Sequence, residues 1–298
     1  MKIRIGYGLG TRTAANRAET FGPLVDDLER LGFDSLWLSE RVGGEAPDPI
    51  VGMAFAAGRT RRLKFGMSVM VLPGRNPVLV AQALASLDRL SGGRLLPAFG
   101  LGVRDPHEQS AFMVDRGGRA ERFDEALALI RRLWSEDGVT HAGPHYRVEG
   151  VTVRPRPLQA PLDVWLGGAS PRELRRVGEV ADGWLPSFTT PELAAEGWAV
   201  VNDAAAAAGR AIDPGHFGAL IPYSTGAIPE AVAELVARRR PDVDVTDVVP
   251  RGSTGLVEQI EAFRAVGASK FVPVPVVEPP DWGEHLEELA AAVLPLQT

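Results

Sequence analysis

The alternation of short apolar runs with amphipathic helical stretches is the feature of this sequence that most limits its fold. Eight runs have the length and composition of strands, at Ile3–Leu9, Ser35–Ser39, Leu63–Val71, Arg94–Leu101, Leu162–Leu166, Gly183–Ser187, His216–Tyr223 and Lys270–Pro275. Between them, apolar residues recur at the three- and four-residue spacing of helices, at Glu19–Leu31, Asn76–Leu90, Arg119–Trp134, Arg172–Val180 and Leu256–Val266. Eight βα units in 298 residues predict an α/β fold, a (β/α)8 TIM barrel with its functional groups on the loops after the strands.

A doubly wound open sheet is the alternative arrangement of alternating strands and helices. Such sheets typically carry a G-x-G-x-x-G turn directly behind the first strand. Here the first strand runs into Gly8-Leu9-Gly10-Thr11, which lacks that spacing, and no helix begins immediately after it. The barrel is therefore the favoured prediction.

No change in composition marks a domain boundary, so residues 1–298 are predicted to form a single domain with two small insertions. The segment 135–160 is too long for a plain connection, and its Gly143-Pro144 predicts a hairpin. The segment 240–253, in which prolines bracket alternating Asp and Val, is predicted to be an insertion before the last βα unit.

An excess of acidic side chains limits the partners of the chain. It has 38 Asp and Glu against 32 Lys and Arg, so no broad basic face for nucleic acid is expected. The absence of cysteine excludes disulfides and thiolate metal sites. The start MKIRIGYGLG lacks the apolar core of a signal peptide, and no apolar run approaches the roughly 18 residues that cross a bilayer. We therefore expect a cytoplasmic protein without nucleic-acid or membrane partners.

The histidines give no sign of a metal site. His107, His141, His145, His216 and His285 are scattered, and none belongs to an H-E-x-x-H pattern. We therefore expect no catalytic metal.

Two consecutive glycines end the fifth predicted strand, in the segment DVWLGGASPREL. Gly167 and Gly168 allow positive φ and close approach of a ligand to the backbone. Ser170 can cap the following helix, and Pro171 suits its first turn. Free N–H groups at a helix start form an anion site, so the segment is either a phosphate site or a tight, well-capped turn without a ligand.

The order of several motifs resembles that of the bacterial luciferase-like monooxygenase superfamily, in its branch that uses the deazaflavin coenzyme F420. The matching segments are Phe33–Glu40, Phe65–Val69 leading to Arg75-Asn76-Pro77, Leu87–Leu95, Gly118–Glu125, Gly167-Gly168-Ala169-Ser170 and Ala181–Trp184. The resemblance covers nearly the whole chain. It implies a (β/α)8 barrel in which F420, or alternatively FMN, lies across the carboxyl ends of the strands, and it implies a homodimer.

The same resemblance implies where the cofactor binds. Ser68 and Val69 match a bulge with a non-proline cis peptide bond that supports the ring, and the loop Gly167-Gly168-Ala169-Ser170 matches the phosphate site. Ser39 matches a position beside the cofactor, and Arg75 lies at the rim, where it would meet an anionic tail. Gly100 and Gly102 would let the backbone approach the ring.

Three residues are candidates for proton transfer. Glu40 matches an acidic residue of deazaflavin-dependent relatives, but Arg41 replaces the histidine that follows it there. Arg41 is expected to pair with Glu40 or to face an anionic ligand, and a surface salt bridge is the alternative. Asp105 could donate a proton if burial raises its pKa, although it also reads as a turn residue before a proline; His107 is the nearest imidazole.

The predicted function is that of an F420-dependent oxidoreductase, which transfers a hydride between deazaflavin and an unidentified small-molecule substrate. The first alternative is an FMN-dependent monooxygenase, and in either case a partner reductase would supply the reduced cofactor. A non-redox barrel enzyme acting on a phosphorylated metabolite and a flavin-holding protein without turnover are further alternatives. Substrate contacts are expected from the segments Thr11-Arg12-Thr13 and Pro222-Tyr223-Ser224.

Overall fold

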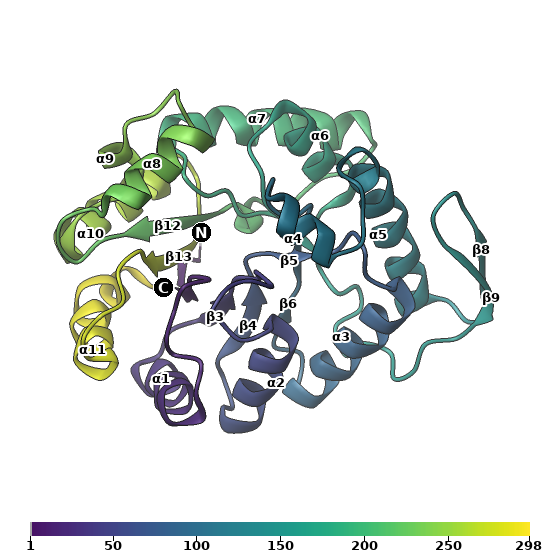
Figure 1. Cartoon of the computed structure of the whole chain (residues 1–298), viewed down its shortest axis with the longest axis horizontal. Helices are drawn as coiled ribbons and strands as arrows, with labels where there is room; N and C mark the ends of the chain where they lie inside the picture. The colour runs from purple at the N-terminus through teal and green to yellow at the C-terminus, as the bar shows by residue number, and fades with distance from the viewer. Residues whose placement is uncertain (1) are drawn as a thin grey trace.

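The computed structural model describes residues 2–298, in which parallel strands form a central ring inside a circle of helices (Figure 1). Three of the barrel strands are each interrupted into two segments. The strands, in chain order, are β1 (Arg4–Ile5) with β2 (Tyr7–Leu9), β3 (Ser35–Leu38), β4 (Lys64–Met67) with β5 (Met70–Val71), β6 (Leu95–Leu96) with β7 (Ala98–Gly100), β10 (Trp165–Leu166), β11 (Gly183–Trp184), β12 (Gly218–Tyr223) and β13 (Lys270–Pro275).

Parallel pairings connect these strands all the way round. β3 pairs with β2 and β4, β4 pairs with β6, and β5 pairs with β7. β10 lies between β7 and β11, and isolated bridges, Trp184 to Phe217 and Ser187 to Leu220, join the sixth strand to the seventh. β13 pairs with β12 and β1, which closes the ring. The predicted TIM barrel is confirmed.

The helices fall into an outer ring and a set at the mouth of the barrel. The outer helices are α1 (Ala18–Leu31), α2 (Pro49–Arg59), α3 (Pro77–Ser91), α5 (Arg119–Ser135), α6 (Pro171–Val180), α7 (Pro191–Ala207), α10 (Gly252–Ala265) and α11 (Trp282–Val293). The helices at the mouth are α4 (Pro106–Ala111), α8 (Glu230–Arg239) and α9 (Val245–Val248), with the 3-10 turn η1 (Arg116–Gly118) before α5. Two further 3-10 turns lie outside both sets: η2 (Pro214–His216) precedes β12, and η3 (Leu294–Leu296) follows α11. In the described part of the chain, no helix has the length and apolar character needed to span a membrane.

One local signal starts five of the helices. In each, a capping side chain precedes a proline at the first helical position and accepts a hydrogen bond from an amide of the first turn; the caps are Asp48, Asn76, Asp105, Ser170 and Thr190. A cap of this kind satisfies otherwise unpaired N–H groups, and proline has no N–H to leave unpaired. Each cap and the proline after it fix where the helix begins, directly after a strand-end loop.

Large aromatic side chains fill the barrel interior below its mouth. A Cβ on Gly66 would lie 2.4 Å from the Trp37 ring, so the glycine makes room for this indole. Trp37 also meets Trp165 edge-to-face with ring centroids 6.4 Å apart, which connects strands on opposite sides of the ring. The interior at this level is a packed core and not a channel.

A buried charge cluster closes the amino-terminal end of the barrel. The carboxylate of Asp34 accepts hydrogen bonds from the Nζ atoms of Lys270 at 2.8 Å and Lys64 at 3.0 Å. Burial lowers the pKa of Lys270 to about 8, and the two ammonium groups outweigh burial and lower the pKa of Asp34 to about 2. The cluster joins the first residues of β4 and β13 to the turn before β3.

The two segments predicted as insertions have structure of their own. Within 135–160, β8 (Val139–Ala142) and β9 (Arg147–Val151) form an antiparallel hairpin that projects from the rim in Figure 1. Within 240–253 lie the short helix α9 and the start of α10. A small separate apolar cluster of Val236, Val248 and Val249 packs α8 against α9.

Candidate active site

A cavity of about 1700 Å³ opens at the carboxyl ends of the strands. The carboxyl end of every barrel strand, or the loop directly after it, contributes to its lining, with Thr11, Glu40, Val71, Leu101, Gly168, Ser187, Pro222 and Val276 as one representative of each. Sites for small ligands usually occupy about 300–1000 Å³, so this cavity has room for a cofactor and a substrate together. Its position is that of active sites in barrels of this type.

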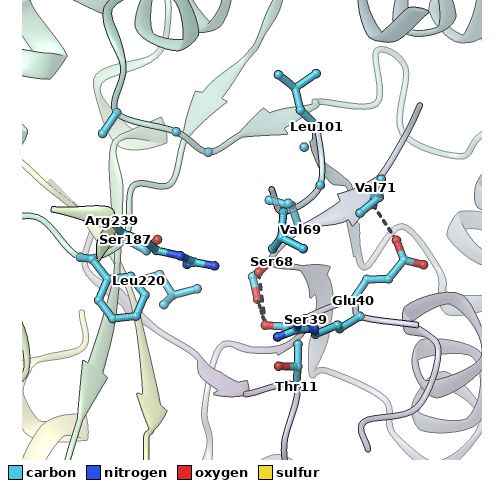
Figure 2. A pocket seen from close by; sticks show the side chains of 18 of the residues that line it. Thr11, Ser39, Glu40, Ser68, Val69, Val71, Leu101, Ser187, Leu220 and Arg239 are labelled. Atoms are coloured by element: carbon cyan, nitrogen blue, oxygen red, sulfur yellow. Dashed lines mark hydrogen bonds between the residues drawn. The ribbon is translucent and has the colours of Figure 1, made fainter. Parts of the chain in front are cut away.

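The peptide bond between Ser68 and Val69 is cis and separates β4 from β5, as the resemblance implied. The Ser39 hydroxyl lies 3.2 Å from both the Ser68 carbonyl oxygen and the Ser68 hydroxyl, and Figure 2 shows these two serines facing each other below Val69. A Cβ on Gly100 would lie 2.4 Å from Val69 Cγ2, so the missing side chain of Gly100 accommodates Val69. Gly102 has φ of +79°, which favours glycine. Together these residues form one wall of the cavity.

Glu40 lies at the edge of this wall, with its side chain only 6% exposed. One carboxylate oxygen accepts a hydrogen bond from the Val71 amide at 2.6 Å, and the other bonds to the Arg75 guanidinium. Burial raises the pKa of Glu40 despite the opposing charge of Arg75. The expectation that Arg41 pairs with Glu40 is wrong, because Arg75 takes that place.

Arg75 does not meet the main cavity. Its Nε donates to the Val71 carbonyl at 2.9 Å, and its side chain lines a neighbouring pocket of about 330 Å³. The expected contact of Arg75 with a cofactor tail at the main rim is therefore not supported, because Glu40 and Val71 hold the guanidinium beside the wall.

Asp105 and His107 lie together at the start of α4. The Asp105 carboxylate accepts from the His107 amide at 2.9 Å and from Arg41 Nη2 at 3.0 Å. The hydrogen bond from the His107 amide and the charge of Arg41 lower the pKa of Asp105, so the condition set for proton donation by Asp105, a pKa raised by burial, is not met. Asp105 is a helix cap and an ion-pair partner, and the exposed His107 side chain also lines the cavity.

Glu108 is a residue of this region that the sequence did not single out. It is 8% exposed, and its carboxylate oxygens accept from the amides of Val42 at 3.0 Å and Gly43 at 2.8 Å. Arg41 Nε lies 3.5 Å from the same carboxylate. Glu108 thus holds the loop after β3 against α4. A glutamate in the first turn of a short helix resembles a solvated residue, so no local signal distinguishes it.

The glycine loop after β10 has the backbone that its sequence predicts. Gly168 has φ of +99°, and Ser170 caps α6. However, the Glu173 carboxylate completes a capping box and accepts from the amides of Ala169 at 3.2 Å and Ser170 at 3.0 Å. Two of the amide donors in the loop that the resemblance assigns to a cofactor phosphate are therefore bonded to a side chain of the protein in this structure.

The two segments expected to touch substrate differ in outcome. Thr11, Arg12, Thr13 and Pro222 line the cavity. Tyr223 is buried, and its hydroxyl lies 2.6 Å from His285 Nε2 of α11, so it faces the outer helices and not the mouth. Ser224 is also buried, and its hydroxyl donates to the Ala227 carbonyl.

Among the described residues, no group of three or more His, Asp or Glu could hold a metal ion. The candidate site consists of the large cavity, the glycine-rich wall beside the Ser68–Val69 cis peptide bond, and the buried carboxylate of Glu40.

The sequence model of the luciferase-like monooxygenase family matches residues 3–262. The chain belongs to this family. A Mycobacterium tuberculosis protein assigned by name to the coenzyme F420-dependent oxidoreductases is 36% identical over 211 residues, which is 64% of this chain and 56% of that protein. The chain thus spans little more than half the length of the curated relatives that it matches first.

Solved structures of similar fold include proteins with either cofactor. An F420-dependent secondary alcohol dehydrogenase in complex with an F420–acetone adduct has a TM-score of 0.83 at 18% identity, with 100% of both chains covered. The oxygenating constituent of 3,6-diketocamphane monooxygenase of Pseudomonas putida, in complex with FMN, has a TM-score of 0.77 at 18% identity, covering 100% of this chain and 99% of that chain. At such identities the likeness shows the luciferase-like barrel and no more.

Proposed function

We propose that this luciferase-like protein is an F420-dependent oxidoreductase that transfers a hydride between deazaflavin and a small organic substrate. The observation that carries the proposal is the open cavity of about 1700 Å³ with a wall built on the Ser68–Val69 cis peptide bond. The name of the M. tuberculosis relative supports deazaflavin over flavin. A cavity that holds a cofactor and a substrate together must be larger than a site for one small ligand, and this cavity is.

The residues present fit a flat, phosphate-bearing cofactor. Val69 and the side-chain-free Gly100 form a surface for a ring, and Gly102 brings the backbone close to it. The loop of Gly167 to Ser170 would hold the phosphate once the Glu173 carboxylate has left the Ala169 and Ser170 amides. When bound, deazaflavin supplies the hydride chemistry, and the chain supplies position and electrostatics.

Glu40 is the residue to which we assign the proton. Burial raises its pKa, and its carboxylate is held in place by the Val71 amide and Arg75. A carboxyl group with a raised pKa holds its proton to higher pH than an ordinary glutamate and can therefore serve as a proton donor. His107 is the second candidate because its imidazole lines the same cavity. Asp105 is the least suited donor because its pKa is lowered.

Equilibrium binding of F420 and of FMN to the purified chain, followed by absorbance and fluorescence of the bound fraction, tests the proposal. F420 should bind at micromolar concentration or below, and more tightly than FMN. Tighter binding of FMN would favour the monooxygenase alternative, which the FMN-bound structural neighbour supports. If neither cofactor binds below roughly millimolar concentration, the redox function is wrong.

Two partners complete the proposal. A reductase that delivers reduced F420, or reduced flavin in the alternative, would supply the electrons, and the chain would act as a homodimer. Protein loaded with reduced cofactor should convert one equivalent of substrate and then stop. Adding a reductase with its electron donor should restore turnover. Light scattering behind a sizing column should give twice the 31.9 kDa of one chain.

A further inference from the structure

Arg239 is a cation inside the cavity that the proposed chemistry does not use. It is the last residue of α8, and Figure 2 shows its side chain beside Ser187 and above Leu220, projecting toward the wall that carries Ser68. Its guanidinium lies 5.8 Å from the centre of the Phe188 ring. A mouth helix thus directs a guanidinium across the cavity toward the proposed cofactor position.

The arginines on either side of Arg239 have acidic partners. Arg238 lies 3.6 Å from Glu234, and Arg240 lies 2.8 Å from Asp242 and donates to the Phe188 carbonyl at 3.0 Å. Within residues 2–298, by contrast, no carboxylate lies within ion-pair distance of Arg239. The Phe188 ring supports the flat guanidinium but does not neutralise it.

The surroundings of Arg239 disfavour an unpaired positive charge. Partial desolvation by the surrounding cavity wall, followed by the like charges of Arg41 and Arg238, lowers the pKa of Arg239. The side chain is nevertheless exposed to the open cavity, and a guanidinium stays protonated in proteins, so its positive charge is available to a ligand there. An anion placed against it would form charge-assisted hydrogen bonds and offset the repulsion from the other two arginines.

Apolar side chains line much of the cavity near Arg239, together with the charged Arg238, Arg240 and Asp242. Leu220, Val232, Leu235 and Val276 line the cavity near α8 and the ends of β12 and β13. A ligand that fills this side therefore has an apolar body and one charged end.

We infer that Arg239 binds an anionic group of the substrate, a carboxylate or a phosphate, and that the substrate is a small molecule with an apolar body. The inference rests on the proposed function, because the cofactor ring is assigned to the Ser68–Val69 wall and the substrate to the space between that wall and Arg239. A guanidinium presents paired N–H donors that match either anion in a bidentate geometry.

Calorimetric titration with three probes of similar shape tests the inference. Phenylacetate and phenyl phosphate carry the two anionic groups, and phenylacetamide is neutral. Each is titrated at constant ionic strength into wild type, Arg239→Gln, Arg239→Lys and the control Arg264→Gln, with and without saturating F420. Arg264 lies on α10 outside the cavity and pairs with Glu261, so its replacement removes one charge without touching the site.

At least one anion should bind wild type and Arg264→Gln about tenfold more tightly than phenylacetamide, and Arg239→Gln should lose this preference. Arg239→Lys should retain only part of it, because lysine keeps the charge but not the paired donors. Melting curves of Arg239→Gln should match wild type, since the side chain makes no ion pair.

Three results would overturn the inference. The first is equal binding of anions and amide to wild type, and the second is an anion preference that survives in Arg239→Gln. The third is a loss of F420 affinity in Arg239→Gln without a change in probe affinity, which would assign the arginine to the cofactor. Failure of the proposed function is distinct: F420 would not bind, while the anion preference in its absence would still depend on Arg239.

Discussion

The guanidinium of Arg41 bonds to the carboxylate of Asp105 at 3.0 Å, although the two residues are 64 positions apart. The contact connects the loop after β3 to the first turn of α4 at the mouth of the barrel. Glu108 reinforces it by accepting from two amides of the same loop. Two loops that line the cavity therefore form one unit, and this unit rather than a single residue shapes the entrance.

Replacing Glu108 with Ala should destabilise the protein by about 2 kcal/mol, because the Val42 and Gly43 amides lose their acceptor. Urea unfolding measures the loss. Glu261→Ala, at a solvent-accessible position of α10, is the control and should change the free energy of unfolding by less than about 0.5 kcal/mol. Equal effects of the two substitutions would show that the loop does not depend on Glu108.

Glu40→Gln should lower kcat by about a hundredfold or more, because an amide cannot exchange the proton that we assign to the carboxyl group. F420 affinity should change much less. The pH profile of kcat should lose the ionisation that lies above the ordinary glutamate range in wild type, in keeping with the raised pKa. Asp48→Asn, which alters a residue 3.9 Å from Arg75, is the control, and a similar loss of kcat there would argue for charge balance instead.

Gly100→Ala should weaken F420 binding, since the new Cβ would lie 2.4 Å from Val69 Cγ2 and push it into the cavity. Val69→Ala in the same chain should restore part of the affinity by removing the clashing methyl groups. Titration of F420 into the two single variants and the double variant measures the coupling. Additive losses would mean that Gly100 acts independently of the Val69 wall.

Glu173→Ala should raise the affinity for F420 and FMN, because it frees the Ala169 and Ser170 amides for a phosphate. It should also lower the free energy of unfolding by about 1 kcal/mol, since α6 loses half of its capping box. Glu179→Ala, an exposed residue at the other end of α6, removes the same charge and should do neither. Unchanged cofactor affinity in Glu173→Ala would remove this loop from the phosphate site.

The stabilising contribution of Asp34 should be lost in acid. Its pKa is about 2 in the folded protein and 3.8 in the reference state, so its contribution is complete above pH 3.8 and is lost as the pH falls toward 2. The shift corresponds to about 2 kcal/mol. Urea unfolding of wild type and Asp34→Asn at a series of pH values should show a steeper acid loss in wild type. Parallel curves would mean that the ion cluster contributes nothing in this range.

Local sequence was sufficient for most of the barrel. Strand runs and helix periodicity are set by neighbours within a few positions, so segments such as Lys270–Pro275 were predicted at their observed bounds. The outer helices α2, α7 and α11 and the mouth helices α4 and α8 were not among the predicted helices. The six residues of α4 are too few to show a helical period. The Ser68–Val69 cis peptide bond came from the family resemblance alone, since no local propensity favours it.

The sequence by itself determined the fold class, the family and the strand-end positions where a site would form. Tertiary structure decided which charges meet there: Glu40 pairs with Arg75 and not Arg41, Glu173 takes the amides meant for a phosphate, and Arg239 faces the cavity without an acidic partner. Periodicity is a property of adjacent residues, whereas an ion pair depends on where distant loops come to lie once the barrel has closed.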